Sequence, residues 1–231
     1  MTYEINRYLD AAVLKPEMSQ KEVEEAIVST LPYAPATLCV RPCDIALTAP
    51  YCQGTQTGVC TVLGFPHGCQ LTASKVDETK RYLSLGVQEI DMVANFGYVR
   101  SQMWSQLHDE IAQIAEVCHK EKVPLKVIFE TCYLNNVEIT KLTEICIAAK
   151  ADFIKTSTGF GTSGATDEGV KTMLEAASGR IKIKPSGGIR DTERARHLIS
   201  LGVHRLGVNY AAVPAICGTS EGAGKPIQGN Y

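Results

Sequence analysis

Charged side chains occur inside four runs of the chain that otherwise have the apolar, β-branched character of buried strands. Lys126, Lys155 and Lys184 lie in three of these runs, and Asp91 lies in the run that precedes them. Burying an unpaired ammonium or carboxylate is costly, so such groups either pair with one another or face a wet cavity. We therefore expect these four residues to gather at one place in the fold.

Several lysines beside a carboxylate are suited to Schiff-base chemistry. An amine attacks a carbonyl carbon only when it is unprotonated, and a second ammonium nearby favours the unprotonated form. The resulting imine withdraws electrons from the neighbouring carbon while a carboxylate or a water moves protons, as aldol cleavage and condensation require. Any one of these residues could instead have a structural role, either in an ion pair or as a lysine whose side chain reaches past the helices to solvent. Their occurrence on four consecutive strands favours a functional cluster.

The elements that must position these residues are short strands alternating with longer segments of helical period. Leu107, Ile111, Ile114 and Cys118, for example, form one apolar helix face. This alternation predicts an α/β fold, a single-domain (β/α)8 TIM barrel over residues 1–217, followed by a flexible glycine-rich tail over 218–231. A doubly wound open sheet is the alternative, but it normally carries a phosphate-binding glycine turn after its first strand. The predicted strands cover residues 8–14, 37–41, 59–64, 89–94, 125–130, 153–158, 181–184 and 205–208.

The composition excludes several classes of function. The 231 residues include 23 Lys and Arg against 25 Asp and Glu, so no basic excess indicates nucleic acid or an anionic membrane as a partner. No apolar run approaches the roughly 18 residues of a membrane span. The nine cysteines lack zinc-site spacing and the five histidines are scattered, so we expect no metal, no other cofactor and no structural disulfide. With no N-terminal signal sequence, we expect a cytoplasmic protein.

Two glycine-rich segments follow predicted strands. Residues 159–164 match the letters of a dinucleotide-binding turn, but they come late in the chain and lack the acidic residue that would bind a ribose, so we reject that interpretation. Gly187 and Gly188, next to Arg190, are better placed, because exposed backbone N–H groups and an arginine suit a phosphate at the mouth of a barrel. A tight turn that requires glycine is the alternative.

Five segments that carry these residues resemble deoxyribose-phosphate aldolases, in the same order over nearly the whole chain. The family consists of metal-free class I aldolases on (β/α)8 barrels, which reversibly join acetaldehyde to glyceraldehyde 3-phosphate and give 2-deoxyribose 5-phosphate. The segment 155–160 (KTSTGF) together with 184–190 (KPSGGIR) is specific to the family. The other segments are 9–16, 89–93 and 125–131.

The resemblance implies roles for individual residues. Lys155 becomes the Schiff-base lysine, Lys184 the second cation beside it and Asp91 the carboxylate of a proton relay. Lys126 and Asp10 become members of the supporting network. Small aldehydes and sugar phosphates become the expected ligands. The implied ligand-binding residues are Gly187, Gly188, Arg190, Asn209, Thr158 and Cys39, the last of which could also react with unsaturated aldehydes or simply pack.

The chain also departs from the family pattern. Asn209 and Tyr210 stand where the family commonly has a serine-containing turn, and we expect the bulky Tyr210 to fill the space of a phosphate. Ala11 and Ala12 stand on the first strand where many family members have larger or polar residues, and they would widen or dry that side of the pocket. Together these residues predict a shift toward unphosphorylated aldehydes.

Other interpretations stay open at this point. Tyr231, the last residue, either assists proton transfer, as in some family members, or belongs to a disordered end. His67 is interpreted as a surface or packing residue. The alternatives to the proposed reaction are another lysine-dependent lyase of the same superfamily and a non-catalytic barrel that binds a sugar phosphate. A homodimer is possible, because exposed barrel helices often pair.

Overall fold

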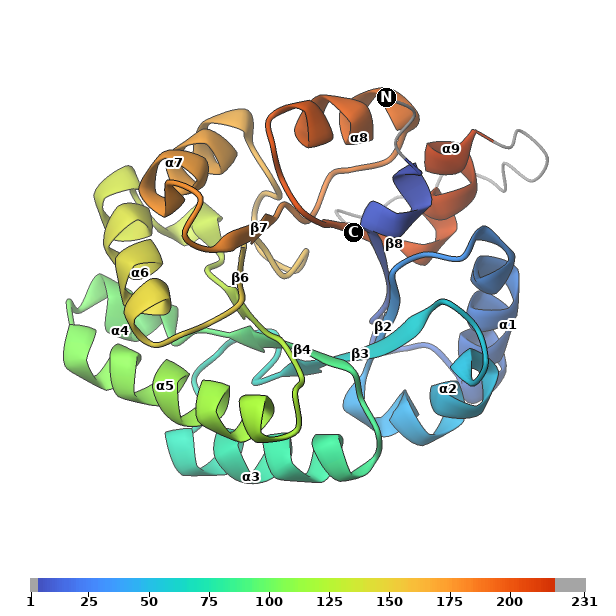
Figure 1. The fold of residues 1–231 in the computed structure, drawn as a ribbon, viewed down its shortest axis with the longest axis horizontal. Coiled ribbons are helices and arrows are strands. Elements are labelled where there is room, and N and C mark those ends of the chain that lie inside the picture. Colours follow the sequence, from blue (N-terminus) through green and yellow to red (C-terminus); the bar gives the residue numbers. More distant parts are fainter. Residues whose placement is uncertain (1–3, 219–231) are drawn as a thin grey trace.

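Eight parallel strands form a closed ring with the helices outside it (Figure 1), in a computed structural model that describes residues 4–218. The strands pair in the order β7-β6-β5-β4-β3-β2-β1-β8, and a parallel bridge from Ser186 to Gly207 joins the two ends of the sheet. The (β/α)8 barrel predicted from the sequence is therefore confirmed. The strands are β1 (Leu9–Val13), β2 (Thr37–Val40), β3 (Gly58–Leu63), β4 (Glu89–Val93), β5 (Leu125–Ile128), β6 (Phe153–Lys155), β7 (Lys182–Lys184) and β8 (Leu206–Asn209).

The helices follow the strands in turn and carry amphipathic stripes toward them. Two begin with reciprocal capping boxes, Ser19 with Glu22 and Asn135 with Glu138, and the Asp191 side chain caps a third helix by accepting from the Arg194 N–H. None of the helices within residues 4–218 has both the length and the apolar character needed to cross a membrane. The helices are α1 (Gln20–Thr30), α2 (Ile45–Cys52), α3 (Thr72–Ser84), α4 (Phe96–Arg100), α5 (Trp104–Lys120), α6 (Asn136–Ala148), α7 (Asp167–Ala177), α8 (Thr192–Ser200) and α9 (Val213–Cys217).

Alternation along the strands separates an apolar outer face from a polar interior. In β1, Leu9, Ala11 and Val13 belong to the core between the sheet and the helices, whereas Asp10 lies between them on the opposite face. The same period places the four charged residues singled out above inside the barrel. The predicted strand 153–158 is shorter in the structure, because the Thr158 N–H donates to the Glu130 carboxylate (3.2 Å) instead of a neighbouring strand.

A buried ion pair outside the barrel connects the loops at its rim. Lys75 of α3 pairs with Glu110 of α5 at 2.9 Å, and both side chains are fully buried. The Lys75 ammonium also donates to the carbonyl oxygens of Gly68 (2.8 Å) and Val93 (2.9 Å), while Glu110 accepts from the Asn95 N–H. Burial lowers the pKa of Lys75 and raises the pKa of Glu110. The pair therefore anchors the ends of β3 and β4 to two outer helices.

We predict that Lys75→Met lowers the free energy of unfolding by about 3–5 kcal/mol, because it leaves the Glu110 carboxylate buried without its cation. The double variant Lys75→Met/Glu110→Leu should recover most of this loss, since no isolated charge remains. Urea denaturation measures both effects. Lys120→Met, which breaks an exposed pair with Glu116, is the control and should leave the midpoint unchanged. A single variant as stable as the double variant would contradict the prediction.

Candidate active site

One buried carboxylate, Asp91, holds the three predicted lysines together inside the barrel. Its Oδ1 accepts a hydrogen bond from the Lys126 Nζ at 2.7 Å. Its Oδ2 accepts from the Lys155 Nζ at 2.7 Å and from the Lys184 Nζ at 2.6 Å. Strand register explains this meeting, because Asp91 pairs with Lys126 across β4 and β5, and Lys155 pairs with Lys184 across β6 and β7. The cluster predicted from the sequence therefore exists, with all four residues at most 3% exposed.

A second set of charged residues is in direct contact with this cluster. Asp10 is 2.6 Å from the Lys184 Nζ and accepts hydrogen bonds from Arg205 and from the Thr37 hydroxyl. Glu89 bridges Arg205 (2.8 Å) and Lys126 (2.5 Å). Arg205 and Glu89 were not singled out from the sequence. Glu89 could have been found, because it precedes Asp91 by two residues and so faces the same side of β4.

The electrostatic balance of the cluster distinguishes Lys155 from the other cations. Burial raises the pKa of Asp91, but the ammonium groups of Lys126, Lys155 and Lys184 outweigh it and hold this pKa well below its usual range. Burial lowers the pKa of Lys126 and of Lys184, yet the carboxylates around each of them raise it above the ordinary lysine value.

Three carboxylates, Asp10, Glu89 and Asp91, thus face four basic side chains in the cluster. Lys126, Lys184 and Arg205 each contact two or more of these carboxylates, whereas Lys155 contacts Asp91 alone. Among these four basic side chains, Lys155 therefore makes the fewest contacts with the three carboxylates.

A cavity opens above the cluster at the carboxyl ends of the strands. Asp91 and Lys126 lie below its floor, since they are fully buried and are not among the residues that line it. The predicted residues that do line it are Lys155, Lys184, Asp10, Thr158, Gly187, Gly188, Asn209 and Cys39. Most of the predicted site is thus brought to one cavity, at the face where barrel enzymes bind substrates.

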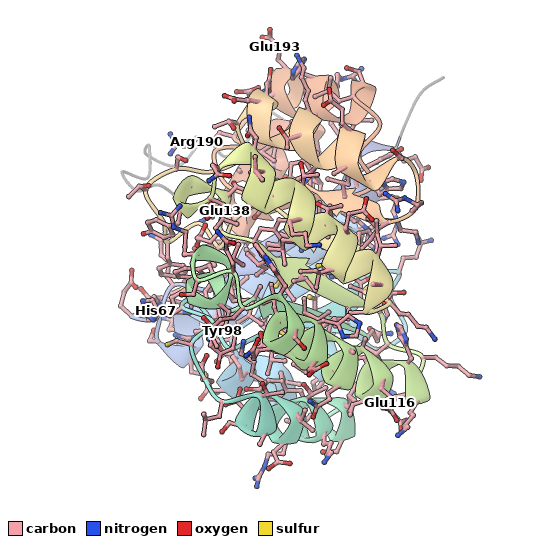
Figure 2. All side chains as sticks on the ribbon, turned by 90° about the vertical axis from the view of Figure 1, so that its left-hand side faces the viewer. His67, Tyr98, Glu116, Glu138, Arg190 and Glu193 are labelled. Atoms are coloured by element: carbon pink, nitrogen blue, oxygen red, sulfur yellow. The ribbon has the colours of Figure 1, made fainter. Side chains whose placement is uncertain are left out.

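Two residues discussed in the sequence analysis, Arg190 and His67, do not line the cavity. Arg190 is exposed, and His67 is exposed as expected; both are found along one edge of the molecule in Figure 2. Tyr231 lies outside the described residues, as does the predicted tail apart from Gly218.

The expectation that Tyr210 occupies the phosphate space is wrong. Tyr210 lines a separate surface groove with Glu22 and Glu25 of α1, while its neighbour Asn209 lines the cavity. The reason is the alternation of side chains at the end of β8, which turns consecutive residues to opposite sides. The same alternation places Ala11 in the outer core, so that Ala12 alone borders the cavity.

The two glycine-rich segments contact one another at the cavity wall. A Cβ atom built on Gly164 would lie 2.5 Å from the backbone of Gly187, and the Ala165 N–H donates to the Gly187 carbonyl oxygen. Gly187 and Gly188 have φ values of +87° and +78°, which other residues rarely adopt. Close approach and backbone conformation therefore both explain the glycines, and they leave the backbone of the second segment facing the cavity.

A closed barrel whose mouth holds one amine beside a buried carboxylate and a second ammonium is the arrangement of a Schiff-base aldolase. Comparison with known proteins agrees. The profile of the DeoC/LacD family aldolases matches residues 11–209 of this chain. The chain belongs to this family.

Individual relatives cover most of the molecule. A deoxyribose-phosphate aldolase of Treponema denticola is 39% identical over 206 residues, which are 89% of this chain and 95% of the relative. One from Aquifex aeolicus is 40% identical over 206 residues, covering 89% and 92% of the two chains. Among solved structures, the aldolase QR15 superposes with a TM-score of 0.86 at 39% identity, over 92% of this chain and 94% of that one.

We predict that Lys126→Met destabilises the protein by about 3–5 kcal/mol at neutral pH, because it removes the cation that lies between the buried carboxylates. The deficit relative to the wild type should shrink as the pH falls toward 4. In the wild type, the pKa of Asp91 is lower in the folded protein than in the unfolded chain, where it is about 3.9, and this difference stabilises the folded state. The stabilisation is fully present above the pKa of the unfolded chain and is lost as the pH falls through the pKa of the folded protein. In the variant, the buried carboxylates lack the Lys126 cation and therefore take up protons at a higher pH than in the wild type. Their neutralisation removes the cost of the unpaired charge, so the difference in stability becomes smaller as the pH falls.

Urea denaturation at pH 8 and pH 4 measures this deficit. Lys182→Met is the matched control, because Lys182 stands two residues before Lys184 but is exposed. An equal deficit at both pH values would show that Lys126 acts by packing rather than by charge.

Proposed function

We propose that this protein is a metal-independent, Schiff-base aldolase that reversibly cleaves 2-deoxyribose 5-phosphate into acetaldehyde and glyceraldehyde 3-phosphate. The observation that carries the proposal is the shared Oδ2 of Asp91, which brings Lys155 and Lys184 together at the floor of the cavity. The names of the relatives supply the substrate. Small aldehydes and sugar phosphates are accordingly the expected ligands.

Lys155 is the nucleophile in this proposal. Its unprotonated Nζ attacks the aldehyde carbon of the open-chain sugar, and loss of water gives an iminium ion at the same place. The iminium carries a single positive charge, which the Asp91 carboxylate can stabilise because it already accepts a hydrogen bond from the Lys155 Nζ. Lys184 stays charged beside it, because Asp10 and Asp91 raise its pKa.

Asp91 is the candidate for proton transfer. Cleavage between carbons 2 and 3 requires removal of the proton from the hydroxyl on carbon 3, and it leaves an enamine that must be protonated on carbon 2. Asp91 lies within 2.7 Å of the Lys155 Nζ, one atom from the reacting carbon, so it can direct this proton itself or through a water. Hydrolysis of the new iminium then releases acetaldehyde and restores Lys155.

The phosphate would bind at the wall formed by Gly187, Gly188 and Asn209. Backbone N–H groups with positive φ values form concave anion sites, and the Asn209 amide can donate a further hydrogen bond. The expected preference for unphosphorylated aldehydes stays a prediction. It rests on Asn209 and Ala12, because Tyr210 lies outside the cavity.

Reduction with borohydride in the presence of acetaldehyde tests the Schiff base. We expect an N-ethyl group on Lys155, found by mass spectrometry of its peptide, and no such group in Lys155→Leu. Lys182→Leu is the matched control from the same part of the barrel and should form the adduct at the wild-type rate. Absence of an adduct in the wild type would favour a non-catalytic, sugar-phosphate-binding barrel. Product analysis would separate this aldolase from another lysine-dependent lyase.

Gly188→Ala tests the phosphate site. The substitution strains a backbone at φ +78° beside the cavity, so we expect KM for glyceraldehyde 3-phosphate to rise by about tenfold, a loss of about 1.4 kcal/mol in binding. KM for unphosphorylated glyceraldehyde should change little. Gly202→Ala is the matched control, because Gly202 has φ +96° and open space around it but lies outside the cavity. Equal effects on both substrates would place the phosphate elsewhere.

A further inference from the structure

Two cysteines lie side by side within the barrel, next to the proposed catalytic cluster. Cys39 of β2 and Cys60 of β3 are register partners, and both belong to the small apolar cluster inside the barrel. Their sulfur atoms and an oxygen of Asp91 all lie within 4.8 Å of one another. Neighbouring strands are about 4.8 Å apart, which is within the range of Cα separations that a disulfide spans.

The two thiols have different surroundings. Cys39 lines the cavity, and the neighbouring Cys60 thiol lowers its pKa against the effect of burial, as do the Lys184 and Lys155 side chains. Cys60 is fully enclosed, with its Sγ 3.3 Å from the Asp91 Oδ1 and 3.5 Å from the Lys126 Nζ, and burial raises its pKa well above the ordinary thiol value. Cys39 is therefore the sulfur that meets a solute first, and Cys60 keeps its proton behind it.

We propose that Cys39 and Cys60 form a reversible disulfide when the protein meets a peroxide, and that this disulfide blocks the proposed aldolase site. The Cys39 thiolate attacks one oxygen of hydrogen peroxide, the O–O bond breaks, and the departing hydroxide takes up a proton as water. This leaves a sulfenic acid on Cys39. The Cys60 sulfur then attacks the Cys39 sulfur, the S–O bond breaks, and the Cys60 proton leaves with the hydroxide as a second water. Two thiols are oxidised and one peroxide is reduced.

The disulfide would change the site in two ways. It removes the Cys60 S–H that lies against the Asp91 Oδ1, so the carboxylate shared by the lysines loses a donor. It also moves the Cys39 sulfur away from the cavity wall toward β3. Both changes affect the geometry around Lys155. A thiol that restores Cys39 and Cys60 should restore the site.

Mass spectrometry of the full-length protein after treatment with hydrogen peroxide tests the proposal without relying on the aldolase reaction. Cleavage before Asp44 under non-reducing conditions separates the peptide with Cys39 from the peptide with Cys60. We expect a loss of two hydrogens from the intact mass and a cross-link between Cys39 and Cys60. Activity should fall together with the appearance of the cross-link and return with dithiothreitol.

Cysteine variants distinguish a Cys39–Cys60 disulfide from general oxidation of the protein's cysteines. The activity of each peroxide-treated variant is compared with that of the same variant without peroxide. Cys60→Ala and Cys60→Ser should give no cross-link, and with excess peroxide Cys39 should proceed to the sulfinic acid, which dithiothreitol does not reverse. Cys146→Ala, which removes a buried thiol of α6 outside the barrel, should behave as the wild type. A cross-link through other cysteines, oxidised Cys39 without a bond to Cys60, or a Cys39 that stays reduced would each overturn the proposal.

Discussion

The rest of the structure depends on the requirement that charges buried inside the barrel be balanced. Asp91 satisfies it for three lysines at once, with one oxygen on Lys126 and the other between Lys155 and Lys184. Burial alone would favour the uncharged form of such groups, but the surrounding charges of opposite sign keep Asp91, Lys126 and Lys184 ionised. The same arrangement leaves Lys155 with one carboxylate contact and an open cavity above it.

The barrel supplies this balance through strand register rather than through loops. Inward residues of neighbouring strands are register partners, so that Asp91 meets Lys126, and Lys155 meets Lys184. The outward residues between them are apolar and pack against the helices. The charged residues of the cluster are thus fixed by rigid strands, whereas the groups expected to bind phosphate lie after β7 and at the end of β8.

Much of this could be predicted from the sequence, because lysines and an aspartate in strand-like runs are rare and the helices and strands alternate regularly. The sequence did not predict which side of the barrel wall a residue at the end of a strand faces. Tyr210 was expected in the cavity and lies against α1, since a one-residue step reverses the direction of a side chain. Arg205 precedes the last strand, and only the closed ring brings it to Asp10, 195 positions away in the chain. Nothing in the sequence around Cys60 indicates that its sulfur lies 3.3 Å from the Asp91 Oδ1, because this contact depends on how the side chains of neighbouring strands meet inside the barrel.

The contact between Gly164 and Gly187 ties the segments after β6 and β7 into one wall, with no space for a side chain between their backbones. Designers who wish to reshape the acceptor pocket would therefore have to redesign both segments in concert. An insertion that lengthens either one alone would lift it from its neighbour and open the pocket to bulk water. Natural variation in acceptor size within such barrels should accordingly appear as paired changes in these two segments.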